Sequence, residues 1–160
     1  MDLWQDKIQV KKGDIGEDII KNYLEQKGWV IYAPTTNKAH YFDMIATRNK
    51  KEIIGYDVKT KARLNKIAAT GIDKQDYLDY KKFTRDYYFP FYLFFVDEKE
   101  GKVYYQLLNK LPEPFELKNK TKVEIVCWYL KDLQFIFSLT EDQKNNLSKF
   151  DNRNYNYKPR

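Results

Sequence analysis

Two neighbouring apolar segments of this chain each carry an acidic side chain, and this feature constrains the fold more than any other. The segments "YFDMIAT" (41–47) and "EIIGYDVKTK" (52–61) have the composition of β-strands, and the polar residues between them suit a hairpin turn. Because strand side chains alternate between two faces, Asp57 and Lys59 project to the same side. If Asp43 faces that side too, two carboxylates and one ammonium group meet at a sheet edge.

The acids in these strands need a compensating charge. Asp43 and Asp57 interrupt otherwise apolar strands, and burial of an unpaired carboxylate is costly. A shared divalent cation would compensate both acids, and an ion pair with Lys59 is the alternative. The D-x-K triplet alone does not decide between them, because 32% of the residues are charged.

The remaining pattern predicts a mixed sheet flanked by helices, an α/β fold. The first helix is expected at 13–28, with Asp14 as its N-cap and Gly28 at its end. A second helix is expected at 72–88, with Asp73 as its N-cap and Asp76 near a capping-box position. Further strands are predicted at 29–34, 89–97, 102–108 and 122–130, and a last helix, capped by Thr140, at 139–150.

Length and composition narrow the class of protein. We expect one domain over 1–150, large enough for a real core, and a flexible basic tail over 151–160. No apolar run is long enough for a membrane span and no signal peptide is apparent, so a cytoplasmic protein is expected. One Cys and one His exclude a Cys/His zinc site, and Cys127 is interpreted as a buried core thiol. The net charge of +6 is a modest indication of a polyanionic partner.

These residues resemble a known superfamily. Glu17 on the first helix, Asp43, and Asp57 with Lys59 are similar to the acid, acid-x-Lys pattern of PD-(D/E)xK nucleases, which have the restriction-endonuclease-like fold. "KKGDIGE" (11–17) is particularly similar to the opening of archaeal-type Holliday-junction resolvases. The resemblance covers about 11–97 and implies an αβββαβ core, which leaves a C-terminal strand and helix extension. Phe42 stands where the motif has Pro, and Asp57 where many members have Glu.

The resemblance implies a metal-dependent endonuclease. Mg²⁺ prefers oxygen ligands, which Asp43, Asp57, the Val58 carbonyl and Glu17 would supply, and Mn²⁺ is expected to substitute. Lys59 would orient or help deprotonate the attacking water and stabilise charge developing on phosphorus. Glu17 borders the buried helix face, and Gly16 beside it would allow a close approach to the sheet.

The partner expected from this reading is DNA, with RNA left open. The residues proposed to contact nucleic acid are Lys11, Lys12, Lys61, Arg63 and Gln75, and simple solvation of the four basic side chains is the alternative. A small domain without an added recognition module favours selection of DNA structure or ends, in repair, recombination or phage defence. A resolvase would act as a homodimer, because two symmetric strands must be cut. His40, in a polar loop, is interpreted as contacting substrate or solvent.

Two other classes of function stay open. One is a non-catalytic nucleic-acid-binding module on the same fold, which would have no physical need for the full set of acids. The other is a small structural or inhibitory protein that binds another protein through its many aromatic side chains.

Overall fold

The computed structural model describes residues 8–33, 42–64, 66–118 and 124–150. The helices are α1 (Ile8–Gln26), α2 (Lys74–Tyr87) and α3 (Glu141–Ser148). The strands are β1 (Val30–Tyr32), β2 (Met44–Arg48), β3 (Glu52–Lys61), β4 (Ala69–Asp73), β5 (Phe91–Asp97), β6 (Lys102–Leu107), β7 (Phe115–Lys118), β8 (Glu124–Tyr129) and β9 (Gln134–Ser138). Short 3₁₀ turns follow β6 and β8, at Leu108–Lys110 and Leu130–Asp132.

The centre of the molecule is a six-stranded mixed sheet in the order β1-β2-β3-β5-β6-β9. Strands β3 and β5 are parallel, whereas the other neighbours in this sheet are antiparallel. A parallel pair needs a crossover connection, and α2 lies in that connection. The predicted α/β fold with its αβββαβ core is confirmed, with β4 added before α2.

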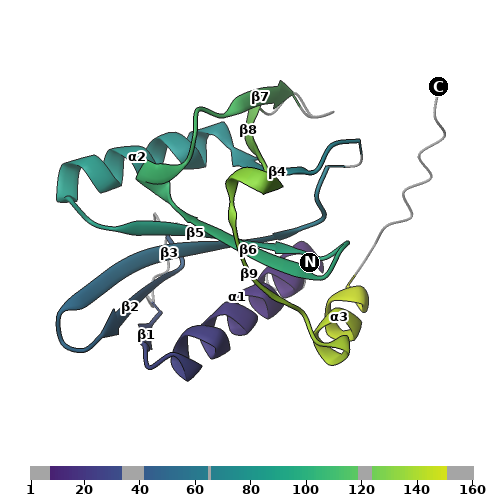
Figure 1. The fold of residues 1–160 in the computed structure, drawn as a ribbon, viewed down its shortest axis with the longest axis horizontal. Coiled ribbons are helices and arrows are strands. Elements are labelled where there is room, and N and C mark those ends of the chain that lie inside the picture. Colours follow the sequence, from purple (N-terminus) through teal and green to yellow (C-terminus); the bar gives the residue numbers. More distant parts are fainter. Residues whose placement is uncertain (1–7, 34–41, 65, 119–123, 151–160) are drawn as a thin grey trace, which may run out of the picture.

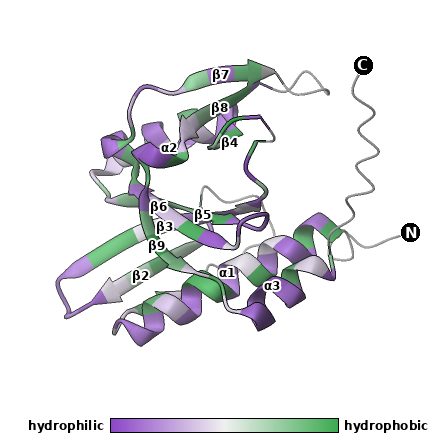
Figure 2. Cartoon of the chain, turned by 45° about the vertical axis from the view of Figure 1, so that its right-hand side comes forward, coloured by the Kyte–Doolittle hydropathy of each residue, from purple (hydrophilic) through white to green (hydrophobic). Residues whose placement is uncertain are grey.

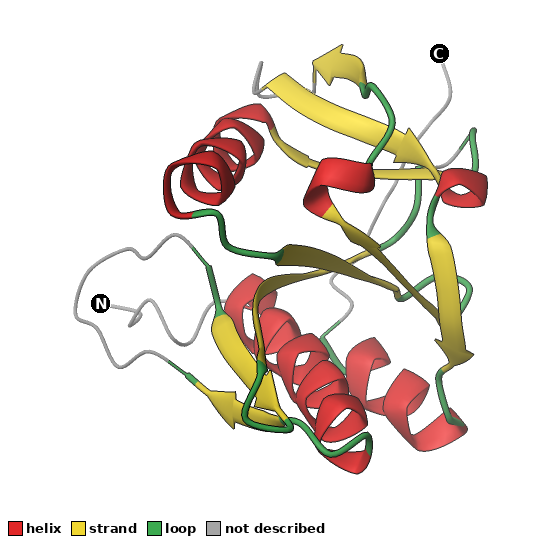
Figure 3. Cartoon of the chain, turned by 60° about the vertical axis from the view of Figure 1, so that its left-hand side comes forward, coloured by secondary structure: helices red, strands yellow, loops and turns green. Residues whose placement is uncertain are grey.

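Two hydrophobic cores lie on opposite faces of this sheet. On one face α1 and α3 pack against the strands, and on the other lie α2 and a small sheet in the order β4-β8-β7 (Figures 1 and 3). Strand β5 contributes to both, because Phe94 and Val96 face α1 whereas Leu93 and Phe95 face α2. An almost wholly apolar strand is therefore covered on both sides, as its sequence predicts.

Helix α1 begins earlier than predicted. It starts at Ile8, so Asp14 lies inside the helix and the predicted N-cap role is wrong. The predicted end is confirmed, since Gly28 follows the helix with φ +83°, a backbone conformation that glycine tolerates best. Hydrophobic and hydrophilic residues alternate along α1 (Figure 2), and Ile19, Ile20 and Leu24 of its apolar stripe are buried.

The other helix starts differ in how they are capped. Asp73 occupies the N-cap position of α2 as predicted, but its side chain makes no capping hydrogen bond. Asp76 completes no capping box and instead forms an ion pair with Lys59. Thr140 caps α3 as predicted, in a reciprocal capping box with Gln143.

The small sheet is the main feature that the sequence pattern did not predict. Strands β4 and β7 lie on either side of β8, the strand expected at 122–130, and β9 was also not predicted. Each of these three strands has five residues or fewer, so each carries little periodic signal. The expected loop histidine His40, the last residue of the strand predicted at 29–34 and the tail 151–160 lie outside the described residues.

No helix in the described ranges is long and apolar enough to cross a membrane.

The close packing of α1 on β3 depends on Gly16. A Cβ atom at this position would overlap the Thr60 hydroxyl group, whereas a Cβ atom at Gly13, in the same helix, would meet open space. We therefore expect Gly16→Ala to lower the free energy of unfolding by about 1–3 kcal/mol. The control Gly13→Ala should raise it by up to about 1 kcal/mol, because alanine favours the helix.

Urea unfolding of both variants measures this difference. Adding Thr60→Ala to Gly16→Ala should recover part of the loss, since it removes the hydroxyl group that the new methyl group meets. Equal stability changes for Gly13→Ala and Gly16→Ala would contradict the packing seen here.

Candidate active site

The carboxylate of Asp43 accepts a backbone hydrogen bond from β3 just beyond the last paired residues of β2 and β3. Backbone pairing between β2 and β3 ends at Met44 and Tyr56. Asp43 lies just before β2, not within it as predicted, and its Oδ2 accepts a hydrogen bond of 2.9 Å from the Val58 amide. This bond holds the Asp43 side chain beside the next residue of β3, Asp57.

Asp57 and Lys59 project together toward α2, as the alternation of strand side chains predicts. Asp57 is only 3% exposed, and its Oδ2 atom is buried without a hydrogen-bond donor in good geometry. The Lys59 ammonium group lies 3.1 Å from this atom and 3.3 Å from a carboxylate oxygen of Asp76, which lies in the first turn of α2. The same ammonium group lies 5.9 Å from the ring centre of Tyr80.

The two aspartates are too close to be ionised together easily. The pKa of Asp43 is raised from 3.8 to about 8, first by burial, then by the charge of Asp57, with smaller contributions from Glu17 and from a hydrogen bond with Asp57. The hydrogen bond from Val58 opposes this rise in pKa and does not overcome it. Near neutral pH and without a bound cation, the pair therefore retains a proton.

The Lys59 ammonium group is strongly stabilised in its charged form. Burial favours the neutral amine, but the negative charge of Asp57 outweighs this effect, with further contributions from the Tyr80 hydroxyl group and the charge of Asp76, and the pKa of Lys59 is raised. A lysine with a raised pKa is a poor proton acceptor. Of the two roles expected for Lys59, the arrangement favours stabilisation of negative charge over deprotonation of water.

Glu17 reaches the same region from α1. Gly16 packs against Thr60 of β3, so the next residue of α1 lies near the strand that carries Asp57. Glu17 is half-buried, and its charge helps to raise the pKa of both Asp43 and Tyr56. The structure thus brings Asp43, Asp57 and Lys59 together directly and places Glu17 within electrostatic range of Asp43.

The donors of this cluster fit a hydrated divalent cation. Within the described ranges no three His, Cys, Asp or Glu side chains are arranged to enclose a metal ion. Mg²⁺, however, is usually held by one or two carboxylates together with waters and substrate phosphate. The buried Asp57 oxygen and the raised pKa of Asp43 both indicate a place where added positive charge would be stabilising.

The residues proposed to contact nucleic acid mostly have partners within the protein. Lys12 pairs with Glu98 at 2.9 Å and Arg63 pairs with Glu100, an arrangement that neutralises part of their charge. Gln75 donates a hydrogen bond of 3.0 Å to Asp79 on the same helix. Lys61 and Lys11 are half-buried, and burial together with the charge of Lys59 lowers the pKa of Lys61. Their contact with nucleic acid stays a prediction.

One member of the site was not found by sequence reasoning. Asp76 is the second partner of Lys59, yet it was interpreted as part of a helix cap because it follows Asp73 by three residues. No local signal separates the two roles, since the contact with β3 depends on how α2 packs on the sheet.

The chain matches no known protein-family model and no curated protein sequence. Its structure is similar to that of the Holliday junction resolvase Hjc from the archaeon Archaeoglobus fulgidus, with a TM-score of 0.53 and 11% identity, over 76% of this chain and 86% of that chain. A bacterial homing endonuclease, I-Ssp6803I, matches with a TM-score of 0.45 and 17% identity, over 63% of this chain and 65% of that chain. The fold predicted from the sequence, the restriction-endonuclease-like α/β fold, is therefore confirmed.

The raised pKa of Asp43 predicts how stability depends on pH when no metal is present. Between pH 3.8 and about 8 the folded protein retains a proton that the unfolded chain releases. This contribution is fully present below pH 3.8 and is lost as the pH rises to about 8, by up to about 1.4 kcal/mol per pH unit. Asp43→Asn keeps an acceptor for the Val58 amide but carries no titrating proton, so its stability should depend less on pH.

Chemical denaturation in EDTA at several pH values between 4 and 9 measures this dependence. The difference between wild type and Asp43→Asn isolates the carboxyl group from other titrating residues. A wild-type stability that rises across this window relative to Asp43→Asn would show that the Asp43 pKa is not raised.

Proposed function

We propose that this protein is a divalent-metal-dependent endonuclease that hydrolyses phosphodiester bonds of DNA at the cluster of Glu17, Asp43, Asp57 and Lys59. The observation that carries the proposal is the placement of the Asp43 and Asp57 carboxylates side by side through the Val58 amide, with the Lys59 ammonium group next to them. Carboxylates paired in this way suit a hard cation, and a fixed ammonium group suits a phosphate.

Each residue of the cluster has a distinct role in this proposal. Asp43 and Asp57 would hold Mg²⁺, or Mn²⁺ in its place, with Glu17 and the Val58 carbonyl as further ligands. A divalent metal held by these residues would supply a more acidic water and would offset negative charge on the phosphate. Lys59, kept protonated by its acidic neighbours, stabilises the negative charge that develops on the phosphate oxygens.

The substrate proposed is DNA of a particular structure, or DNA ends. The similarity in fold to a Holliday junction resolvase supports branched DNA as the first structure to test. Cutting of two symmetric strands would require a homodimer. The cellular role proposed is repair, recombination or phage defence in the cytoplasm. RNA is the alternative substrate to test.

The experiment is a cleavage panel of duplex, single-stranded, flap and four-way DNA, with a matched RNA duplex, in Mg²⁺, Mn²⁺ or Ca²⁺. We expect cleavage of at least one DNA substrate in Mg²⁺ and Mn²⁺, and binding with little cleavage in Ca²⁺. Equal cleavage in EDTA and in Mg²⁺ would refute the proposed mechanism.

One observation favours the alternative of a non-catalytic nucleic-acid-binding module. The Lys59 ammonium group already compensates Asp57 and Asp76, as a purely structural ion pair would. In the same panel, such a module would bind DNA with similar affinity in every metal and would cleave none. The ion pair does not include Asp43, because within the described residues that carboxylate contacts no basic side chain.

A further inference from the structure

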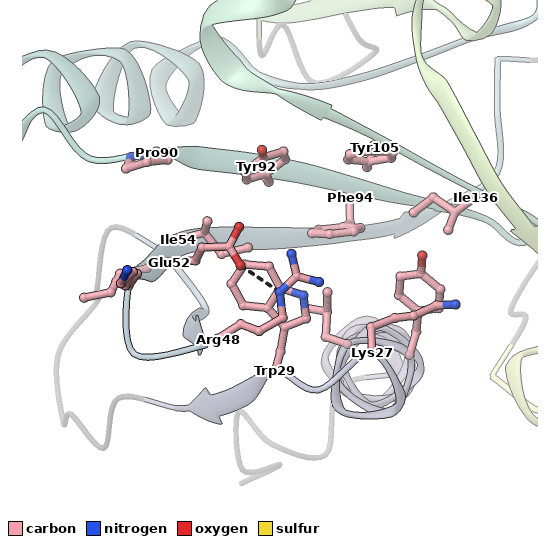
Figure 4. Close-up of a pocket in the computed structure, with 14 residues that line it drawn as sticks. Lys27, Trp29, Arg48, Glu52, Ile54, Pro90, Tyr92, Phe94, Tyr105 and Ile136 are labelled. Atoms are coloured by element: carbon pink, nitrogen blue, oxygen red, sulfur yellow. Dashed lines mark hydrogen bonds and ion pairs between the residues drawn. The ribbon is translucent and has the colours of Figure 1, made fainter.

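A cavity of about 560 Å³ lies on the opposite side of the sheet from the aspartate cluster. It is bounded by the end of α1, the hairpin between β2 and β3, and residues of β5, β6 and β9 (Figure 4). Ile54 and Phe94, which line it, belong to the core on the α1 side, whereas Asp57 and Lys59 face α2. The proposed nuclease function does not involve this cavity.

The walls of the cavity contain flat aromatic surfaces. The rings of Tyr92 and Tyr105 are stacked, with centroids 6.0 Å apart and planes 26° apart, and Phe94 stacks on Tyr105 at 5.8 Å and 19°. Trp29 lies across the cavity from them (Figure 4). Surfaces of this kind bind planar ring systems by stacking, with little dependence on the pattern of polar groups on the ring.

The rim of the cavity is cationic. Lys27, Arg48 and Lys51 line it together with a single acidic residue, Glu52. The Arg48 guanidinium group is held over the Trp29 ring, 4.7 Å from its centre, and its Nε donates a hydrogen bond of 2.8 Å to Glu52. A guanidinium group has four further N–H donors, and Arg48 points them into the cavity region (Figure 4). A phosphate group suits such a fixed donor array.

We propose that this cavity binds a nucleotide, with the base stacked on the aromatic wall and the phosphate attracted to the cationic rim. A volume of about 560 Å³ lies within the range of small-ligand sites. The ligand comes either as a free nucleoside monophosphate or as an unpaired nucleotide of a DNA strand. Both ligands present the same base and phosphate to the cavity. The experiment below distinguishes the free nucleotide from the nucleotide in a DNA strand.

Binding of dAMP, followed by titration calorimetry and by tryptophan fluorescence, is the direct test, with deoxyadenosine and inorganic phosphate as partial ligands. Lys27→Glu should weaken dAMP binding about tenfold or more, because it reverses one charge of the rim. Lys131→Glu is the matched control: both lysines are exposed and lie over a tyrosine ring, Lys27 at 5.8 Å from Tyr23 and Lys131 at 5.5 Å from Tyr129. Trp29→Leu should remove part of the stacking energy, and its thermal unfolding checks the fold.

A single-stranded oligonucleotide and a blunt duplex separate the two sources. Binding of dAMP that falls in Lys27→Glu and persists in Lys131→Glu supports a site for the free nucleotide. If dAMP binds only weakly, preferential binding of the single strand over the duplex, lost in Lys27→Glu alone, supports an unpaired nucleotide of DNA. No saturable binding of either probe, or equal losses in both lysine variants, overturns the proposal. Neither result depends on Asp57, so the nuclease proposal stands or fails separately.

Discussion

Replacement of Asp57 by asparagine should abolish metal-dependent cleavage while the protein continues to bind DNA. Loss of residues that only support metal ligands costs about 10–100-fold in activity or metal affinity, so loss of a direct ligand should cost at least about a hundredfold. Asparagine has nearly the same shape as aspartate but lacks the charge that attracts a cation. It also lowers the repulsion that the site exerts on phosphate, so DNA affinity should be unchanged or higher.

Single-turnover cleavage rates and DNA binding in Ca²⁺ measure the two effects separately. Asp79→Asn is the matched control, because it makes the same substitution on a half-buried carboxylate of α2 that accepts a hydrogen bond from Gln75. A circular dichroism melt of each variant excludes unfolding as the cause. Wild-type cleavage by Asp57→Asn would remove Asp57, and with it the proposed site, from the mechanism.

Replacement of Lys59 by methionine should also remove most of the turnover, by about 10²–10³-fold, the effect typical of a lost group that stabilises transition-state charge. Methionine retains the apolar stem but has no ammonium group. The substitution leaves the buried carboxylate of Asp57 without its cation, so a lower stability is expected as well. Lys59→Arg keeps the charge and should recover part of the rate if charge is what matters.

The control for this second prediction is Lys82→Met, on an exposed position of α2. Asp76→Asn is the complementary variant, because it removes a partner of Lys59 and leaves the Lys59 ammonium group in place. If Lys59 acts on phosphate, Asp76→Asn should reduce cleavage far less than Lys59→Met. Similar losses in both would indicate that the ion-pair network, and not the ammonium group, is what the activity requires.

The two proposed sites divide the chain's basic residues in an unexpected way. Lys12 and Arg63, which the sequence suggested as phosphate contacts, are paired with acids that follow β5. Lys27, Arg48 and Lys51, which no motif singled out, line a cavity together. Charge counted along a sequence does not show which cations are already neutralised, because their partners are distant in the chain.

Local patterns were sufficient for several elements. The apolar segments predicted the hairpin of β2 and β3, and Thr140 as an N-cap predicted the start of α3. These signals depend on contacts between residues a few positions apart, so they can be read from the sequence directly. The prediction of Asp14 as the N-cap of α1 is wrong, because an acidic residue that suits a helix start is also tolerated inside a helix that begins earlier.

By itself, the sequence determined that β2 and β3 are adjacent strands and that Asp57 and Lys59 share a face. Only the tertiary structure decided that Asp43 binds the Val58 amide, that Asp76 from α2 completes the contacts of Lys59, and that the cavity forms across the sheet. The physical reason is the separation along the chain of the residues that interact. Side-chain alternation is a property of one strand's backbone. Contacts between elements depend instead on the pairing of β3 with β5, which α2 connects, and on how the helices pack over these strands.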